Sequence, residues 1–198
     1  MHTLKLFFLA TTFAGLASTP VFAQATDSDA LNLSGTQAQT CTLGAFSASA
    51  ATGALVVGDF GAGALSLTGT MNPSTAVRAA GSITLNAAAM CNYSHNVSVR
   101  QSGGGLINAS DLAPTQGTFI RKQGYDAIVS WAAEIITASS PDVTDEPSTP
   151  AAVTSLNQSI NGAASGTLSL TLSVTGSASP ILSGTYTDSV VVQIGADL

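Results

Sequence analysis

Two stretches near the C-terminal end of the chain alternate between apolar and polar residues, and this alternation strongly restricts the fold. From Leu168 to Val174, leucine and valine occupy every second position, with serine and threonine between them. Within Ser183–Ile194, the residues of one parity include Tyr186, Val190, Val192 and Ile194. A period of two with many β-branched residues is typical of strands that bury one face. The Gly-Ser-Ala-Ser-Pro connection between the stretches predicts that they pair as antiparallel neighbours.

The rest of the chain offers further segments with strand character, separated by turn signals. The clearest are Cys41–Leu43, Leu65–Thr68, Ser82–Cys91 and Asn96–Arg100. Residues 124–137 fit both a helical stripe and a period of two, but their aromatic and β-branched content favours a strand with Trp131 in the core. A total of roughly seven strands predicts an all-β fold of the sandwich type.

The first 25 residues have the pattern of a signal peptide. Lys5 precedes an apolar run, Leu6–Ala17, that is too short to cross a bilayer. Small residues then define two candidate cleavage sites, after Ala23 and after Ala25, and we favour the second because it is an A-x-A site. We therefore expect export through the inner membrane. No later apolar run is long enough to span a bilayer, so no transmembrane span is expected.

Composition and cysteine content limit the partners and the chemistry. Beyond the signal peptide four basic residues face eleven carboxylates, and this acidic balance without a basic patch argues against a nucleic-acid partner. Cys41 and Cys91 are the only cysteines, and an oxidising compartment would allow them to form a disulfide.

The titratable residues do not form a recognisable catalytic, cofactor or metal site. His95 is the only histidine after the signal peptide, and it precedes a predicted strand in a turn, where we expect it to be solvated. The acidic residues Asp142, Asp145 and Glu146 lack the spacing of a calcium loop. No P-loop lysine follows Gly103–Gly105, which we expect to be a flexible hairpin tip. The sequence therefore predicts no catalytic residues, no cofactor and no metal.

Four places in the chain carry a resemblance to a known family. A polar extended segment leads into Cys41-Thr-Leu43, Ile83-Thr-Leu85 runs into Cys91, and Tyr125–Ala133 is similar to a central strand of the family. The most specific place is Gly184–Val192, which is similar to the terminal strand motif G-T-Y-x-D-x-V-x-V. In these places the chain resembles chaperone–usher pilus subunits of the spore coat protein U-like branch, and together they cover most of residues 31–194.

This resemblance implies an immunoglobulin-like β-sandwich over residues 41–198 that lacks its last strand. Such a domain would expose a groove beside its terminal strand, lined by Tyr186, Val190, Val192 and Ile194. A periplasmic chaperone would cover the groove, an outer-membrane usher would assemble the subunits, and a neighbour's donor strand would then fill it. The resemblance thus implies a homo- or heteropolymer at the cell surface, such as a fimbria or a spore-coat-like layer, and no enzymatic activity.

The N-terminal extension, residues 26–40, is the candidate donor strand. Leu31, Leu33 and Gly35 share one parity and could enter alternate pockets of a neighbour's groove. The alternative is a disordered leader after the signal peptide. Compared with the family, the separation of the two cysteines looks long, so the resemblance implies an insertion around Gly58–Ala80. A second function also stays open, in which a self-complete secreted sandwich binds a glycan through an exposed Tyr93 or Trp131.

Overall fold

The structure is a computed structural model that describes residues 34–53, 55–61, 64–69, 72, 74–108, 118–144 and 156–196. The chain divides after Gln37 into two units, Met1–Gln37 and Ala38–Leu198, and each is considered by itself. Residues 34–37 of the first unit are exposed and lie in no strand, Gly35 among them. The signal peptide and two residues of the expected donor strand, Leu31 and Leu33, lie outside the described residues.

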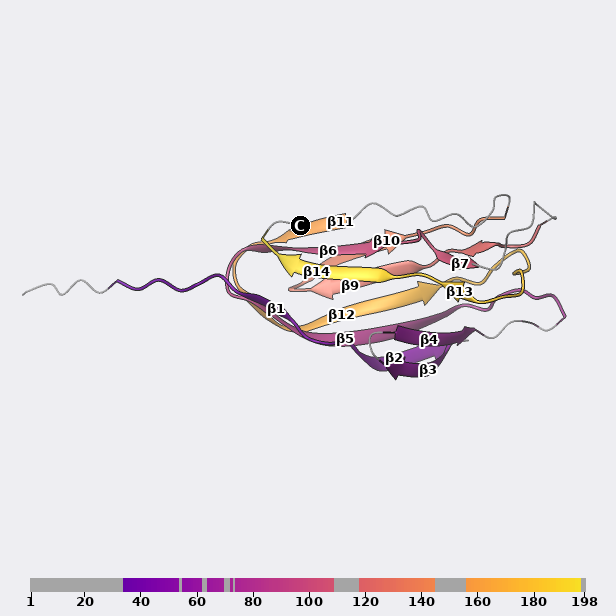
Figure 1. Ribbon diagram of the computed structural model, residues 1–198, viewed down its shortest axis with the longest axis horizontal. Coiled ribbons are helices and arrows are strands. Elements are labelled where there is room, and N and C mark those ends of the chain that lie inside the picture. The colour runs from indigo at the N-terminus through magenta and orange to yellow at the C-terminus, as the bar shows by residue number, and fades with distance from the viewer. Residues whose placement is uncertain are drawn as a thin grey trace, which may run out of the picture. The chain divides into compact units, whose positions relative to one another are not determined.

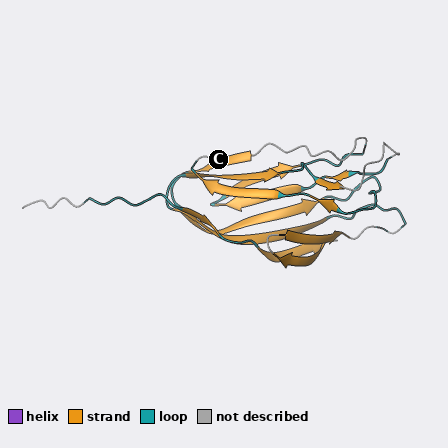
Figure 2. Cartoon of the chain, in the orientation of Figure 1, coloured by secondary structure: helices purple, strands orange, loops and turns teal. Residues whose placement is uncertain are grey.

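The second unit is built from antiparallel β-strands, which confirms the predicted all-β class (Figure 2). No helix occurs in the described ranges, and none there could therefore span a membrane. The largest sheet has the order β1-β5-β12-β9-β10, and β2 pairs with the same edge of β5 as β1 does. Its strands are β1 (Cys41–Leu43), β2 (Ser47–Gly53), β5 (Gly81–Cys91), β9 (Asp126–Trp131), β10 (Glu134–Ser139) and β12 (Ala164–Val174).

A second sheet of three strands has the order β11-β6-β14 (Figure 1). Its members are β6 (His95–Gln101), β11 (Leu156–Ile160) and β14 (Val190–Gly195). A small sheet joins β7 (Leu106–Asn108), β8 (Lys122–Gln123) and β13 (Tyr186–Thr187) in the order β13-β7-β8. Between β2 and β5, where the insertion is expected, β3 (Leu55–Gly61) and β4 (Ala64–Gly69) form a separate hairpin.

The core lies between the two larger sheets, which therefore pack as a β-sandwich. Alternate residues of β5, among them Ile83 and Leu85, meet Val97 and Val99 of β6 in one buried cluster. The period of two in the sequence correctly identified these inward faces, since successive side chains of a strand point to opposite sides. The cluster also includes Val129, Trp131, Ile136, Ile160, Leu168, Leu170 and Val174.

The predicted pairing of the two C-terminal stretches is wrong. Residues 168–174 belong to β12, whose two edges are occupied by β5 and β9. The stretch Ser183–Ile194 is not one strand but two, because it breaks at Asp188 and Ser189 between β13 and β14. β14 pairs with β6 in the opposite sheet. The connection between the stretches therefore crosses the sandwich instead of forming a hairpin.

The ambiguous segment 124–137 is a hairpin and not a single strand. Ala132 and Ala133 adopt positive φ angles of 50° and 69°, as the two central residues of a tight type I′ hairpin turn do. The turn shifts the parity of the following residues, so Ile136 is buried whereas Ile135 is 68% exposed. Trp131, directly before the turn, is buried as predicted.

Candidate functional site

The outer edge of β14 is the most distinctive structural feature of the second unit. β14 pairs with β6 on one side, and no described strand pairs with its other side. The Ser102 N–H donates to the Ser189 carbonyl at 2.8 Å, so Ser189 is oriented toward β6. Because backbone groups alternate in direction along an antiparallel strand, the N–H and C=O groups of Val190, Val192 and Ile194 point to the open edge.

The same three residues direct their side chains into the core, but the core covers them only in part. Val190, Val192 and Ile194 are half-buried, whereas their neighbours Val97 and Val99 on β6 are completely buried. Leu43 at the end of β1 and Phe46 just after it are likewise half-buried against the core. β1 lies close to β14 without being paired to it.

We call this set of five residues, Leu43, Phe46, Val190, Val192 and Ile194, the open-edge strip. It combines a row of outward-facing backbone hydrogen-bonding groups with apolar side chains that retain exposed surface. An unpaired edge of this kind is a ready template for another strand. Three of its members are the predicted groove residues of the terminal strand.

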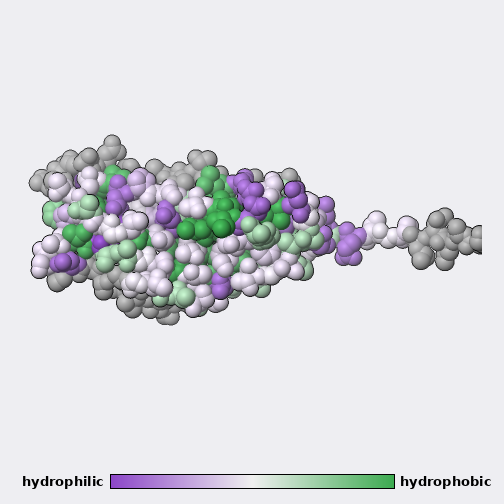
Figure 3. All heavy atoms as spheres, turned by 180° about the vertical axis from the view of Figure 1, so that it is seen from behind, coloured by the Kyte–Doolittle hydropathy of each residue, from purple (hydrophilic) through white to green (hydrophobic). Residues whose placement is uncertain are grey.

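Other apolar side chains are exposed outside the strip. The large ones among the described residues are Met90, Phe119, Ile135 and Leu156. Figure 3 shows that hydrophobic side chains also gather near the middle of the face turned away from the viewer in Figure 1. Within the described residues, nothing in the structure indicates what would cover these four side chains.

Tyr186, the fourth predicted groove residue, has a different position. It lies on β13, which pairs with β7 and not with β6. Its hydroxyl lies 2.8 Å from the Leu182 carbonyl and 3.1 Å from the Ile120 carbonyl, to which it can donate. Tyr186 therefore ties together two loop segments and is not part of the open-edge strip.

Asp188 anchors the start of β14. Its carboxylate accepts hydrogen bonds from the N–H groups of Gly103, at 2.6 Å, and Gly105, at 3.2 Å. It also accepts the Tyr125 hydroxyl at 2.7 Å and the Ser189 N–H at 2.7 Å. The pKa of Tyr125 is raised well above its ordinary value, first by burial and then by the hydrogen bond and the negative charge of Asp188.

The expectation of a flexible hairpin tip at Gly103–Gly105 is therefore wrong. All three glycines are buried, and their loop wraps around the Asp188 carboxylate. A side chain at position 103 would come within 2.9 Å of the Asp188 Oδ1 atom and of Ile107. Glycine is required there because the backbone approaches the carboxylate closely. The loop amides of Gly103 and Gly105 therefore bind the Asp188 carboxylate within the protein and not a phosphate.

His95 is buried, and the prediction of a solvated histidine is also wrong. The Trp131 Nε1–H group donates to His95 Nε2 at 2.9 Å, and His95 Nδ1 lies 2.8 Å from the Tyr93 carbonyl. Both ring nitrogens are thus engaged within the core. The alternation along β6 could have predicted this burial, since His95 lies on the same face of the strand as Val97 and Val99. The burial of Trp131 removes it as a sugar-stacking residue for the glycan alternative.

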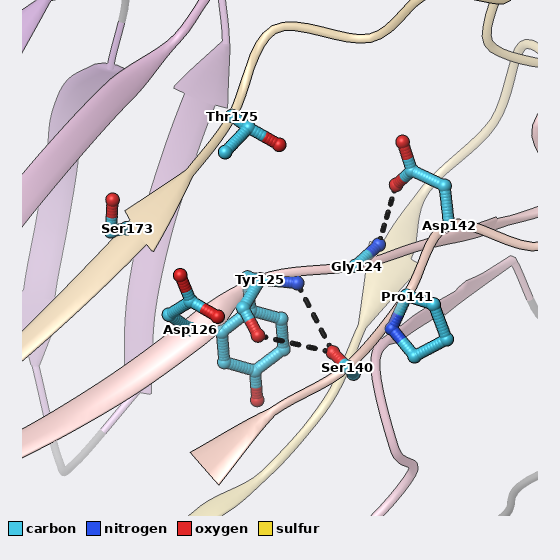
Figure 4. A pocket seen from close by; sticks show the side chains of 8 residues that line it. All are labelled: Gly124, Tyr125, Asp126, Ser140, Pro141, Asp142, Ser173 and Thr175. Atoms are coloured by element: carbon cyan, nitrogen blue, oxygen red, sulfur yellow. Dashed lines mark hydrogen bonds between the residues drawn. The ribbon is translucent and has the colours of Figure 1, made fainter. Parts of the chain in front are cut away.

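A small polar pocket of about 130 Å³ lies between β9, β12 and the loop after β10 (Figure 4). Its acidic residue Asp142 accepts the Gly124 N–H at 2.7 Å and pairs with Arg78 at 3.3 Å. The Ser140 hydroxyl bridges the N–H and C=O of Tyr125. Much of the hydrogen-bonding capacity here is therefore used within the protein. Within the described ranges, no group of histidine, cysteine and acidic residues suits a metal ion.

The disulfide between Cys41 and Cys91 is present, as predicted. The two cysteines are direct partners in the ladder of β1 and β5, so the bond fastens the first core strand to the second. It lies at the N-terminal end of β1, immediately after the extension that carries the candidate donor residues. The bond therefore fixes the start of the second unit, directly after residues 38–40.

None of the family models searched matches this sequence, and no curated protein matches it either.

Proposed function

We propose that this protein is an exported, non-enzymatic structural subunit of a bacterial surface fibre or coat, and that it polymerises by donor-strand exchange. The observation that carries the proposal is the open-edge strip. Its apolar side chains contact the core yet are only half-buried, and the outward-facing backbone groups of Val190, Val192 and Ile194 lack a described partner strand. An added strand would satisfy those groups and cover the side chains together.

The strand order supports an immunoglobulin-like domain with one strand missing. In an immunoglobulin sandwich, strands A, B, E and D form one sheet and strands C, F and G form the other. Here β1, β5, β12 and β9 follow one another in the first sheet, and β6 pairs with β14 in the second. β14 takes the place of F, so the open-edge strip lies where G would pair.

In this proposal the occupant of the edge is the N-terminal extension of another subunit, with Leu31, Leu33 and Gly35 facing the neighbour's core. A periplasmic chaperone would cover the edge before assembly, and an outer-membrane usher would receive the subunit. Main-chain hydrogen bonds would supply affinity, and the alternate apolar side chains would set the register.

The test replaces Leu31 and Leu33 with aspartate in the exported chain. Burying two unpaired charges against an apolar edge costs several kcal/mol, so polymers should disappear while the subunit still folds. The matched control places the same charges on the opposite parity, with Asn32→Asp and Ser34→Asp. Electron microscopy and light scattering should show fibres for the control only. Fibres of normal length from the Leu31→Asp, Leu33→Asp protein would refute the donor role of this segment.

A further inference from the structure

The chain just before β1 is held by a compact set of hydrogen bonds to Asn92. The Asn92 Oδ1 atom accepts the Thr40 N–H at 2.8 Å, and its Nδ2 group donates to the Ala38 carbonyl at 2.8 Å. The main-chain N–H of Asn92 donates to the Thr40 carbonyl at 3.1 Å. Since Asn92 follows Cys91 directly, these bonds continue the β1–β5 pairing past the disulfide.

This set of bonds makes little contribution to the core. Ala38, Thr40 and Asn92 are all exposed, so their hydrogen bonds form in competition with water. Hydrogen bonds of this kind add little net stability. What they do fix is the path of the chain, because one side chain holds two alternate residues, 38 and 40, in an extended conformation.

Residues 38 and 40, which Asn92 holds, lie beside one end of the open edge of the same domain. Cys41 is opposite Cys91 at the end of β5, and Gly195 is opposite Asn96 at the start of β6. The short loop from Asn92 to Ser94 joins these two ends. The start of β1 and the end of β14 therefore share one end of the sandwich, and residues 38–40 lie next to this end.

If the extension paired with the open edge of β14 in its own domain, it would have to meet two requirements. It would have to reverse direction just before β1, and residues held extended at 38 and 40 cannot form the turn that a reversal needs. It would also run parallel to β14, since β14 ends where β1 begins. Parallel pairing is somewhat weaker per residue than antiparallel pairing. The extension of a second copy has neither restriction.

We propose that Asn92 is a positioning residue that keeps the extension out of its own domain's open edge and directs it to a second copy. The inference rests on the proposed function, because it assumes that the extension is the donor. Loss of the two side-chain hydrogen bonds frees residues 38–40 to turn, and self-occupied monomers then compete with polymers.

The experiment compares the exported chain with its Asn92→Ala and Asn92→Asp variants after refolding at increasing protein concentration. Aspartate retains the acceptor for the Thr40 N–H but replaces the donor to the Ala38 carbonyl with a second acceptor. The control is Asn157→Ala, an exposed asparagine on β11, across β6 from β14. At the lowest concentration, light scattering should show a monomer fraction about fivefold larger for both Asn92 variants than for the wild type, and no change for the control. This excess should shrink as the protein concentration rises, because only the competing assembly depends on concentration.

A second measurement separates positioning from a merely structural role. In the Asn92→Ala monomer, adding Leu31→Asp and Leu33→Asp should lower the thermal midpoint, because the monomer's own extension then leaves its edge. With Asn92 intact, the same pair should leave the monomer's midpoint unchanged. Polymerisation of Asn92→Ala at the wild-type level, or a midpoint that is insensitive to the leucine changes, would overturn the inference.

A peptide experiment keeps the two proposals distinguishable. A synthetic peptide of residues 26–37 is added to the Leu31→Asp, Leu33→Asp monomer, and binding is followed by fluorescence anisotropy. Peptide binding together with unchanged assembly of Asn92→Ala refutes the role of Asn92 and supports the donor. Absence of peptide binding refutes the proposed function itself.

Discussion

The Asp188 carboxylate and the Tyr125 hydroxyl lie 2.7 Å apart and form a hydrogen bond that links the start of β14 to the start of β9. Tyr125 is buried, and the Asp188 carboxylate also binds two amides of the glycine loop. One side chain thus joins three segments that are distant in sequence, and it fixes the position from which the open edge begins.

Replacement of Asp188 by alanine should therefore destabilise the domain strongly. The change leaves the Gly103 N–H, the Gly105 N–H and the Tyr125 hydroxyl without their acceptor, and bonds to a charged group contribute about 1.5–3 kcal/mol each. We expect a loss of about 3 kcal/mol or more in the free energy of unfolding, measured by denaturant titration. Glu134→Ala, at the exposed first position of β10, is the control and should change stability by less than about 0.5 kcal/mol. Equal stability of both variants would contradict the anchoring role.

The raised pKa of Tyr125 predicts a loss of stability in alkali. Folding favours the neutral phenol, so its contribution is complete below the unfolded value of 10.0 and is lost as pH rises above it. Above that pH the free energy of unfolding should fall by up to about 1.4 kcal/mol per pH unit. The Tyr125→Phe protein should show a shallower decline between pH 9 and 11.5, whereas Tyr93→Phe, which alters a half-buried ring, should follow the wild type. Identical slopes for all three proteins would contradict this prediction.

The bond between His95 and Trp131 can be tested with the intrinsic fluorescence of the chain, because Trp131 is its only tryptophan. His95→Ala removes a buried ring and leaves the indole N–H without an acceptor, which should cost about 2–4 kcal/mol. Emission should also shift in the folded state. A double-mutant cycle with Trp131→Phe should show coupling of about 0.5 kcal/mol or more. Strictly additive effects would mean that the bond contributes nothing to stability.

Removal of the disulfide should reduce stability without changing the fold of the sandwich. The bond closes a loop of 50 residues, for which the chain-entropy model gives about 4 kcal/mol. Cys41→Ser with Cys91→Ser should lose most of this free energy of unfolding, and dithiothreitol should have a comparable effect on the wild type but none on the double mutant. Two free thiols in the mass spectrum of the non-reduced, exported protein would contradict the bond itself.

The sequence determined which residues face the core. Alternation in β5 and β12 followed directly from side-chain geometry, because neighbouring residues of a strand must point to opposite faces. The same rule covered His95, which shares the parity of Val97 and Val99, although its polar character suggested a solvated position. The cysteine pair was equally determined, since no other cysteine was present and the expected export would favour oxidation.

Only the tertiary structure decided which strands are neighbours. The hydrogen bonds between strands are made by backbone groups that nearly all residues share. The alternation in β12 and β14 therefore could not reveal that these two strands belong to opposite sheets. Asp188 illustrates the same limit at a single residue. Its position in an alternating stretch suggested a continuous strand. In the structure its carboxylate binds amides more than 80 residues away, and the chain at Asp188 separates β13 from β14. The open edge of β14 arises from this break and from the pairing with β6, and neither is visible in the local pattern of the sequence.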